Sequence, residues 1–504
     1  MLIQGLPVGT RPAGRLLSGD RRGVGAMDPF TAMLRVLEAM FWVAAGMFAI
    51  VYRIVRFLFF FWRAHHSTPL KFPLSARFEH THIVAGSGHG KTQLLQQLIL
   101  YDLDGVKSGQ ASIIVIDSQG DMLKNILSLA EVGKMQERLV LIDPVIDIQN
   151  PPALNLFDLG LKRLERYDEI EREKLINGAI ALYEYVFGAL LGAELTNRQG
   201  VIFRYLARLM MTVPGANIYT LMEFMDKPNS VRPHLDKLDR SARYFFESQF
   251  FSPDFDSTRQ QILTRLWGVL SNRTLERMLD NEQNKVDLFE AMNKGSIILI
   301  NTAKDLLKQE GCEILGRFFV ALIAQAVQER ASLPEDKRLP TFVFIDEAQD
   351  YFDESIESLL NQGRKYKVGL IIAHQNLDQF SQKLRASVMA STSIKLVGGL
   401  SAKDTAAFAR EMGCEEAFIS ERRKHPKHTE FACFIRNHQR EPSALAVPLG
   451  LMEREPRMSE KEREAMLSAN RLRICGERRD VRSLAGPKVG EETERAAVSQ
   501  PEML

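Results

Sequence analysis

The sequence predicts an α/β fold with a mainly parallel sheet, an all-helical insertion and an N-terminal apolar segment. Short apolar runs such as SIIVID, SIILIN and TFVFID alternate with helical patterns along most of the chain. Strands that are apolar at every position have both faces covered, which is typical of parallel sheets flanked by helices. Between residues 161 and 290 such runs are missing, and apolar residues recur at three- and four-residue spacing, which predicts helices.

Length and composition limit the class of protein. A chain of 504 residues exceeds one average domain, so two folded units with accessory segments are expected. The net charge of +2 neither marks nor excludes a nucleic-acid binder, because a motor can confine its basic residues to a pore or a stripe. The cysteines are scattered without a CxxC pair, so neither a disulfide framework nor a zinc site is expected, and a reducing compartment fits.

The chain divides into segments of different pattern. We expect a disordered basic tail at 1–33, a membrane-associated helix at 34–62 and a charged disordered tail at 451–504. The two parts of the α/β domain are expected at 63–160 and 291–450, on either side of the helical insertion at 161–290. The expected strands are Thr81–Ala85, Ser112–Asp117, Arg138–Pro144, Ser296–Asn301, Thr341–Asp346, Gly369–Ala373, Ser393–Val397 and Glu430–Ile435. The expected insertion helices are Tyr167–Leu191, Asn197–Met211, Ile218–Met225 and Thr258–Leu279, and a long helix follows at Cys312–Arg330.

The N-terminal segment holds the most apolar stretch of the chain. Apolar runs at Ala39–Tyr52 and Phe57–Trp62 are separated by Arg53 and Arg56. A membrane-spanning helix needs about 20 mostly apolar residues, so one span is favoured if these arginines snorkel to the interface. An interfacial helix and a buried soluble helix are the alternatives. Either Met1 or Met27 serves as the translation start, and the sequence does not decide between them.

A glycine-rich turn follows the first expected strand and precedes an amphipathic helix that begins at Gln93. Its sequence is that of a phosphate-binding loop, with Ala85 in place of the first glycine of the strict pattern. Glycines let successive backbone N–H groups point at phosphate oxygens, and the helix N-terminus adds partial positive charge. We expect the nucleotide to be held by Gly86, Ser87, Gly88, His89, Gly90, Lys91 and Thr92. Lys91 would reach the β- and γ-phosphates, Thr92 would bind Mg²⁺, and His89 would contribute mainly its backbone. A chance glycine-rich turn is the alternative.

Two adjacent carboxylates end the strand Thr341–Asp346. Hydrolysis of a nucleotide needs a metal ligand and a group that positions water. We expect Asp346 to bind Mg²⁺ and Glu347 to orient and polarise the attacking water. A plain strand end with solvated charges is the alternative.

Three further polar residues are candidates for the same site. Gln375 follows the next strand and could sense the γ-phosphate, or it is an ordinary loop residue; His374 beside it is assigned no role. Arg364 could act on the γ-phosphate of a neighbouring subunit, or it is a basic residue at a helix C-terminus. Asp117 could reach the nucleotide if its strand pairs with Thr81–Ala85, or it caps the following turn.

The motif order AGSGHGKT, VIDSQGD, a helical insertion, FVFIDEAQD and GRKYKVGLIIAHQN resembles the FtsK–HerA superfamily of ring-forming motor ATPases. Within it, the apolar N-terminus and the insertion look most like a type IV secretion coupling protein. The resemblance covers roughly residues 78–440. It implies a RecA-like P-loop NTPase fold, Lys91 and Thr92 as the Walker A pair, and Asp346 and Glu347 as the Walker B pair. It also implies Gln375 as the sensor and Arg364 as a finger in trans.

The resemblance further implies ATP and Mg²⁺ as cofactors and a homohexamer that threads DNA through its pore independently of sequence. Its partners would be a relaxase and a type IV secretion channel. A nucleotide site faces the cytosolic ATP pool, so we expect the motor in the cytoplasm at the bacterial inner membrane. The leading hypothesis is an anchored DNA translocase. The alternatives are a secretion ATPase that moves no DNA, a soluble HerA-like motor, and a membrane scaffold switched by nucleotide.

Overall fold

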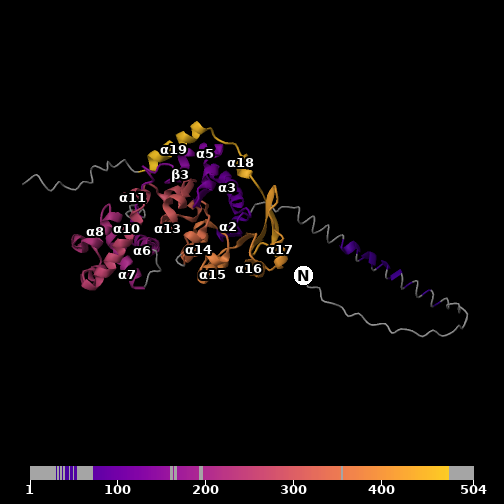
Figure 1. Cartoon of the computed structure of the whole chain (residues 1–504), viewed down its shortest axis with the longest axis horizontal. Coiled ribbons are helices and arrows are strands. Elements are labelled where there is room, and N and C mark those ends of the chain that lie inside the picture. Colours follow the sequence, from indigo (N-terminus) through magenta and orange to yellow (C-terminus); the bar gives the residue numbers. More distant parts are fainter. Residues whose placement is uncertain are drawn as a thin grey trace, which may run out of the picture. The chain divides into compact units, whose positions relative to one another are not determined.

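The computed structural model describes residues 72–158, 163, 167–191, 197–353 and 356–475, and part of the stretch 30–53. The chain separates into two compact units, residues 1–66 and 67–504 (Figure 1). In the first unit the described residues between Phe30 and Arg53 are helical. No helix among the described residues is both long and apolar enough to cross a membrane. Residues 1–29 and 54–62 of the expected tail and membrane helix lie outside the described residues.

The second unit is built on a nine-stranded sheet of order β3-β4-β2-β5-β6-β1-β7-β8-β9. All pairs from β3 to β7 are parallel, whereas β8 and β9 are antiparallel to their neighbours. The strands are β1 Thr81–Ala85, β2 Ser112–Asp117, β3 Leu139–Ile142, β4 Ile297–Asn301, β5 Thr341–Ile345, β6 Val368–His374, β7 Ile394–Gly398, β8 His428–Ile435 and β9 Ser443–Pro448. This mixed, mostly parallel sheet fits a RecA-like P-loop NTPase and confirms the expected α/β class.

Helices cover both faces of the sheet, as the continuous apolar strands predicted. In β2, Ile113 and Val115 join the core on one face, and Ile114 and Ile116 join the core on the other. The first face is covered by α3 Lys91–Lys107, α4 Asp121–Leu127 and α5 Ala130–Gly133. The second is covered chiefly by α13 Lys304–Glu329 and α14 Glu357–Gly363. Shorter helices near the remaining strands are α2 Leu74–Phe78, α15 Gln382–Ser391, α16 Ala402–Met412 and α17 Glu416–Ser420.

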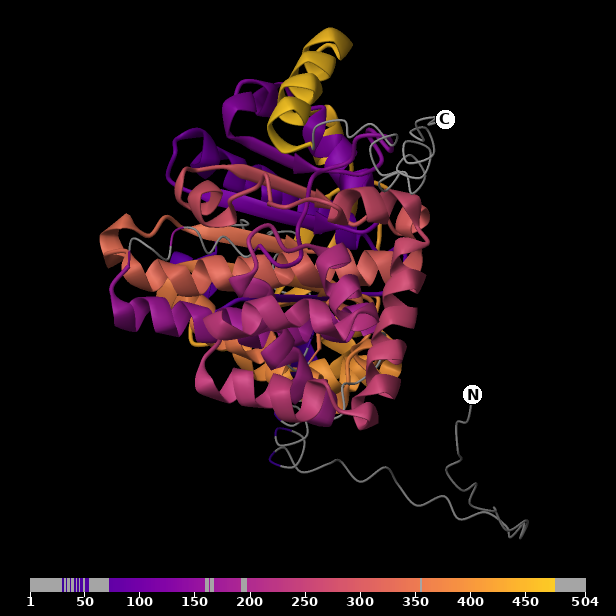
Figure 2. The ribbon, with the colours of Figure 1, turned by 90° about the vertical axis from the view of Figure 1, so that its left-hand side faces the viewer.

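The chain between β3 and β4 carries helices joined by loops, and none of its described residues belongs to the nine strands of the sheet. Its helices are α6 Glu169–Leu191, α7 Asn197–Thr212, α8 Ile218–Asp226, α9 Arg240–Phe245, α10 Asp256–Leu270, α11 Arg273–Leu279 and α12 Leu288–Asn293. Aromatic rings hold the inner helices together, with Phe187 of α6 stacked on Phe203 of α7 at 4.7 Å between centroids. Helix α6 packs along α13, so these helices share one core with the second face of the sheet (Figure 2).

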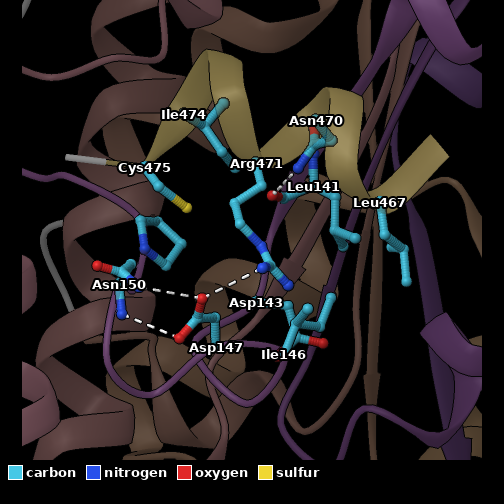
Figure 3. A pocket seen from close by; sticks show the side chains of 11 residues that line it. Leu141, Asp143, Ile146, Asp147, Asn150, Leu467, Asn470, Arg471, Ile474 and Cys475 are labelled. Atoms are coloured by element: carbon cyan, nitrogen blue, oxygen red, sulfur yellow. Dashed lines mark hydrogen bonds and ion pairs between the residues drawn. The ribbon is translucent and has the colours of Figure 1, made fainter. Parts of the chain in front are cut away.

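The stretch 451–475, which the sequence assigns to a disordered tail, is folded. It forms α18 Leu451–Arg454 and α19 Glu460–Ile474, and residues 476–504 lie outside the described residues. Helix α19 lies on the edge strand β3, where the Asn470 amide donates to Leu141 O at 2.9 Å and accepts from Leu141 N at 3.0 Å (Figure 3). The prediction failed because α19 buries only a narrow stripe, Met466, Asn470 and Ile474, on an otherwise charged helix.

His80 joins three elements just before β1. The imidazole is 1% exposed, and its Nε2 donates to Leu360 O of α14 at 2.7 Å. Its Nδ1 accepts from Leu370 N of β6 at 3.0 Å. Only the neutral ring can donate at one nitrogen and accept at the other. Burial is the main reason that the pKa of His80 is lowered to about 4.

We therefore expect the fold to lose stability between pH 6.5 and 4. In that range the unfolded chain binds a proton at His80 that the folded chain does not, so the free energy of unfolding falls as the pH falls. A shift from 6.5 to about 4 corresponds to about 3 kcal/mol by pH 4. Urea-unfolding midpoints at several pH values should show a shallower decline for His80→Gln, whose amide keeps both hydrogen bonds without titrating. The exposed His438→Gln is the control, and equal slopes for both variants would contradict the assignment.

Candidate functional site

The glycine-rich loop connects β1 to α3, which begins at Lys91, two residues before its expected start. Gly88 and Gly90 have φ values of +73° and +113°, which side-chain-bearing residues rarely adopt. Gly90 is the N-cap of α3, and no side chain caps this helix. The first N–H groups of a helix have no intrahelical acceptor, so the start of α3 offers them to an anion.

The Gly399 backbone and the Thr429 side chain leave the loop little room for side chains at its base. A Cβ on Gly86 would lie 2.1 Å from Gly399 O, and a Cβ on Gly90 would lie 2.7 Å from Thr429 Cγ2. A Cβ on Gly88, by contrast, would meet nothing within 4 Å. The loop is thus packed against β7 and β8 at its base, and its tip at Ser87 and Gly88 is exposed. This open tip above a fixed base fits a cradle for a nucleotide's phosphates.

The segment around the start of β8 holds the loop from the side. Lys424 Nζ donates to Gly88 O at 3.0 Å, and the Thr429 hydroxyl donates to His89 O. The His89 ring meets Glu430 O at 2.8 Å through Nε2. His89 therefore contributes a buried side-chain contact as well as its backbone, which no sequence pattern indicated.

Lys91 meets both predicted Walker B carboxylates. Its Nζ donates to Asp346 Oδ1 and, at 2.6 Å, to Glu347 Oε1. The Lys91 side chain is 10% exposed, and those of Asp346 and Glu347 are 12% and 14% exposed. The structure thus brings Lys91 together with a pair of carboxylates that lie about 255 positions later in the chain.

Glu347 is fixed by several contacts in an uncommon backbone conformation. Its φ is +49°, in the left-handed region where residues other than glycine are sparse. Its Oε1 also accepts from Gln375 Nε2 at 3.2 Å, and its Oε2 accepts from Gln349 Nε2 at 2.8 Å. Such outliers persist where surrounding contacts hold them, and they cluster at functional sites. Gln375 lies at the end of β6, next to β5, as the sequence predicted.

The charges of Lys91 and Glu347 stabilise each other, whereas burial outweighs the attraction of Lys91 at Asp346 and raises the pKa of that carboxyl. Burial alone would lower the pKa of Lys91, but the adjacent Asp346 and Glu347 outweigh burial and raise it. Burial opposes the charge of Glu347, but Lys91 dominates, so the pKa of Glu347 is lowered. At neutral pH Lys91 is therefore a cation and Glu347 an ionised carboxylate, which can accept a hydrogen bond from water.

The residues present fit a nucleotide with Mg²⁺. The uncapped start of α3 and the ammonium of Lys91 suit phosphate oxygens. Thr92, the second residue of α3, and Asp346 supply hydroxyl and carboxylate oxygens, the ligands that Mg²⁺ prefers. The half-buried Thr92 follows directly on the buried Lys91.

Asp117 was expected to reach the nucleotide if its strand, β2, paired with β1, and the two strands do not pair. Strand β1 pairs with β6 and β7, whereas β2 lies between β4 and β5, so β1 and β2 are not neighbours. The Asp117 carboxylate is buried and accepts from Gln119 N and Met122 N, each at 3.0 Å. Burial is the main reason that its pKa is raised. Asp117 thus caps the turn after β2, which was the alternative reading.

Arg364 lies away from the cluster in its own chain. It is the C-cap of α14, four positions before β6 begins at Val368, whereas Gln375 follows the other end of that strand. Seven residues of strand span roughly 23 Å. The Arg364 guanidinium, 66% exposed, pairs with Glu79 Oε1 at 2.7 Å. Arg364 therefore cannot reach its own phosphate loop without a large movement.

A buried histidine pair lies next to the sensor position. His82 Nε2 and His374 Nε2 are 2.7 Å apart, and the two rings stack at 4.9 Å between centroids. Burial is the main cause that lowers the pKa of His374 to about 4, so it is neutral in the native protein. The sequence assigned His374 no role, and its packing between β1 and β6 agrees with a core residue.

Comparison with protein-family models finds no match, and comparison with curated proteins finds none either. The fold is nevertheless similar to solved structures of the plasmid coupling protein TrwB. The complex of TrwB with ADP and Mg²⁺ has a TM-score of 0.52 at 16% identity over 75% of this chain and 88% of that chain. The complex with the non-hydrolysable ATP analogue ADPNP has a TM-score of 0.52 at 16% identity over 77% and 89%. The trigonal form of bacterial conjugative coupling protein TrwBdeltaN70 with sulphate also has a TM-score of 0.52 at 16% identity, over 77% of this chain and 89% of that chain.

At this level of identity the similarity concerns the fold. It extends over three quarters of this chain and nearly the whole of the compared TrwB chains. The chain therefore has the fold of a conjugative coupling protein, as its resemblance to the FtsK–HerA superfamily implied.

Proposed function

We propose that this chain is an ATP-hydrolysing motor of the type IV secretion coupling kind, which moves DNA through a homohexameric ring. The observation that carries the proposal is the convergence of Lys91, Asp346 and Glu347 beside the uncapped start of α3. The fold of TrwB, which is solved with ADP and Mg²⁺, supports the same conclusion. The conjugative context of that protein makes DNA the favoured cargo.

Each site residue has a defined task in this proposal. The phosphate loop and Lys91 would hold the β- and γ-phosphates, and Thr92 and Asp346 would hold Mg²⁺, which supplies charge neutralisation on the phosphates. Glu347 orients and polarises water, since its carboxylate is ionised and fixed by Gln375. For Lys91 to reach a phosphate, its contacts with the two carboxylates have to loosen.

The ring would complete the site with a residue from the next subunit. Arg364 is exposed and remote from its own loop, which suits delivery to a neighbouring copy. In the full proposal residues 34–62 anchor the motor at the bacterial inner membrane, with 63–450 in the cytoplasm and 161–290 as its helical insertion. A relaxase and a type IV secretion channel would be its partners.

The decisive experiment measures ATP hydrolysis by the full chain with single- and double-stranded DNA. We expect DNA to stimulate the rate and added salt to weaken the stimulation, because backbone phosphates dominate sequence-independent binding. Lys91→Ala should abolish hydrolysis, and Lys107→Ala, an exposed lysine on the same helix, should not. A hydrolysis rate that depends on Lys91 but does not respond to DNA would overturn the translocase. It would favour the alternative, a secretion ATPase that moves no DNA.

A further inference from the structure

The turn that leads into β8 gathers two imidazoles and a carboxylate. One donor atom each from His425, His428 and Glu430 lies within 4.8 Å of the other two. Glu430 Oε1 is 3.8 Å from His425 Nε2 and 3.6 Å from His428 Nε2. Donor atoms around one tetrahedral zinc ion lie about 3.3 Å apart, given metal–ligand bonds of about 2 Å. Small side-chain adjustments therefore suffice to bring all three onto a single ion.

We infer that His425, His428 and Glu430 form a transition-metal site, with Zn²⁺ as its best-suited ion. Two imidazole nitrogens with one carboxylate oxygen are a donor set that zinc accepts and that Mg²⁺ does not favour. Three protein ligands leave a coordination position for water or another group. Cysteine spacing gave no sign of this site because its donors are histidines and a glutamate.

The backbone already holds the three donors in register. His425 N donates to His428 O at 2.7 Å, and Glu430 N donates to Arg423 O at 3.0 Å, so residues 423–430 form a tight reversal. His428 and Glu430 are two apart on β8 and point to the same face. The two histidine rings stack at 4.5 Å between centroids. A metal ion that binds here would therefore have to order little of the backbone.

The carboxylate is oriented by a basic neighbour. Arg422 NH1 lies 3.4 Å from Glu430 Oε2, and the Arg422 side chain is 11% exposed. Oε1 is the oxygen that faces the histidines. A partner on the second oxygen is the arrangement by which outer groups orient metal ligands.

Most positive charges near the turn oppose a cation only weakly, and the charge of the nearly buried Arg422 is paired with both Glu430 and Glu421. Arg423, Lys424 and Lys427 are exposed, so water and salt screen them. The Lys424 ammonium is also directed to Gly88 O of the phosphate loop. A bound ion would hence lie on the segment that contacts the phosphate loop through Lys424, Thr429 and Glu430. The site itself does not rest on the proposed ATPase.

The test is a titration of the nucleotide-free full chain with Zn²⁺ against a chromogenic chelator. We expect His425→Ala/His428→Ala to bind one equivalent fewer than wild type. His438→Ala, which removes an exposed histidine from the turn after β8, should bind as many as wild type. Excess Mg²⁺ should not displace the ion. Co²⁺ in place of Zn²⁺ should give a visible absorption band in wild type and lose it in the double variant.

Equal stoichiometry in wild type and the double variant would show adventitious zinc only and overturn the site. So would the absence of zinc uptake by the wild type. If the double variant does not fold, as judged by circular dichroism, Glu430→Gln takes its place, since it keeps the shape of the side chain but removes the anionic ligand. A Glu430→Gln protein that binds zinc as tightly as wild type would likewise overturn the site. Nucleotide binding and hydrolysis play no part in these zinc measurements. The metal site and the proposed ATPase function can therefore be refuted independently of each other.

Discussion

Glu347→Gln is expected to lower ATP hydrolysis by about 10²–10⁴-fold while ATP binding stays near wild type. The ionised carboxylate of Glu347 can accept a hydrogen bond from water and polarise it, which a neutral amide does much less well. The loop and Lys91, which would carry phosphate binding, are unchanged by the substitution. Hydrolysis is followed by phosphate release, and binding by a fluorescent ATP analogue.

The glutamine fits the site, so a loss of activity would report chemistry rather than misfolding. Its carbonyl oxygen can accept from Lys91 and Gln375 as Glu347 Oε1 does. Its amide nitrogen would face Gln349 Nε2, which donates to Glu347 Oε2 in the wild type, so the Gln349 amide has to turn over. That turn presents Gln349 Oε1, a buried oxygen without a hydrogen-bond partner among the described residues, as the acceptor. Glu137→Gln, an exposed surface change, is the matched control. Hydrolysis within a few-fold of wild type in Glu347→Gln would refute the role of Glu347.

Arg364→Ala is expected to reduce hydrolysis by about 10³–10⁵-fold, the effect of an arginine that stabilises transition-state charge on the γ-phosphate. Arg364 lies at the opposite end of β6 from Gln375, so its action requires a second copy. Mixed rings test this directly. Arg364→Ala subunits keep an intact phosphate loop, and Lys91→Ala subunits keep an intact arginine, so mixing two inactive proteins should restore activity.

The neighbouring Lys365→Ala is the matched control, since Lys365 is equally basic and exposed but has no assigned role. Lys365→Ala should hydrolyse ATP like wild type by itself, without being mixed with another variant. Failure of the mixture to regain any activity, with both variants shown to co-assemble, would remove Arg364 from the site. The ion pair with Glu79 would then remain as the contact that the structure shows for the Arg364 guanidinium.

The sequence predicted features that depend on neighbouring residues. The phosphate loop, the apolar strands and the Asp346–Glu347 pair are local patterns, and each lies in the structure as expected. Gln375 beside Glu347 also followed, because consecutive strands of a parallel sheet commonly pair. These agreements rest on backbone geometry that a short stretch of chain determines by itself.

Features that depend on contacts between distant residues could not be predicted from the sequence. The alternation of β9, Ser443–Pro448, is too weak to mark a strand, and β9 forms because β8 offers it an edge. The prediction that Asp117 reaches the nucleotide required β2 to pair with β1, but β5 and β6 lie between these strands. The contacts of Lys424 and Thr429 with the phosphate loop span about 340 residues and have no local signature.

The amide of Asn470 has a practical consequence for handling the protein. An edge strand with free backbone groups invites pairing with another chain, and β3 would be such a strand without its cover. Asn470 occupies the N–H and C=O of Leu141, and Met466 and Ile474 bury apolar surface beside it. A chain shortened at residue 450 would uncover that edge and favour aggregation, whereas one that extends through Cys475 keeps it closed.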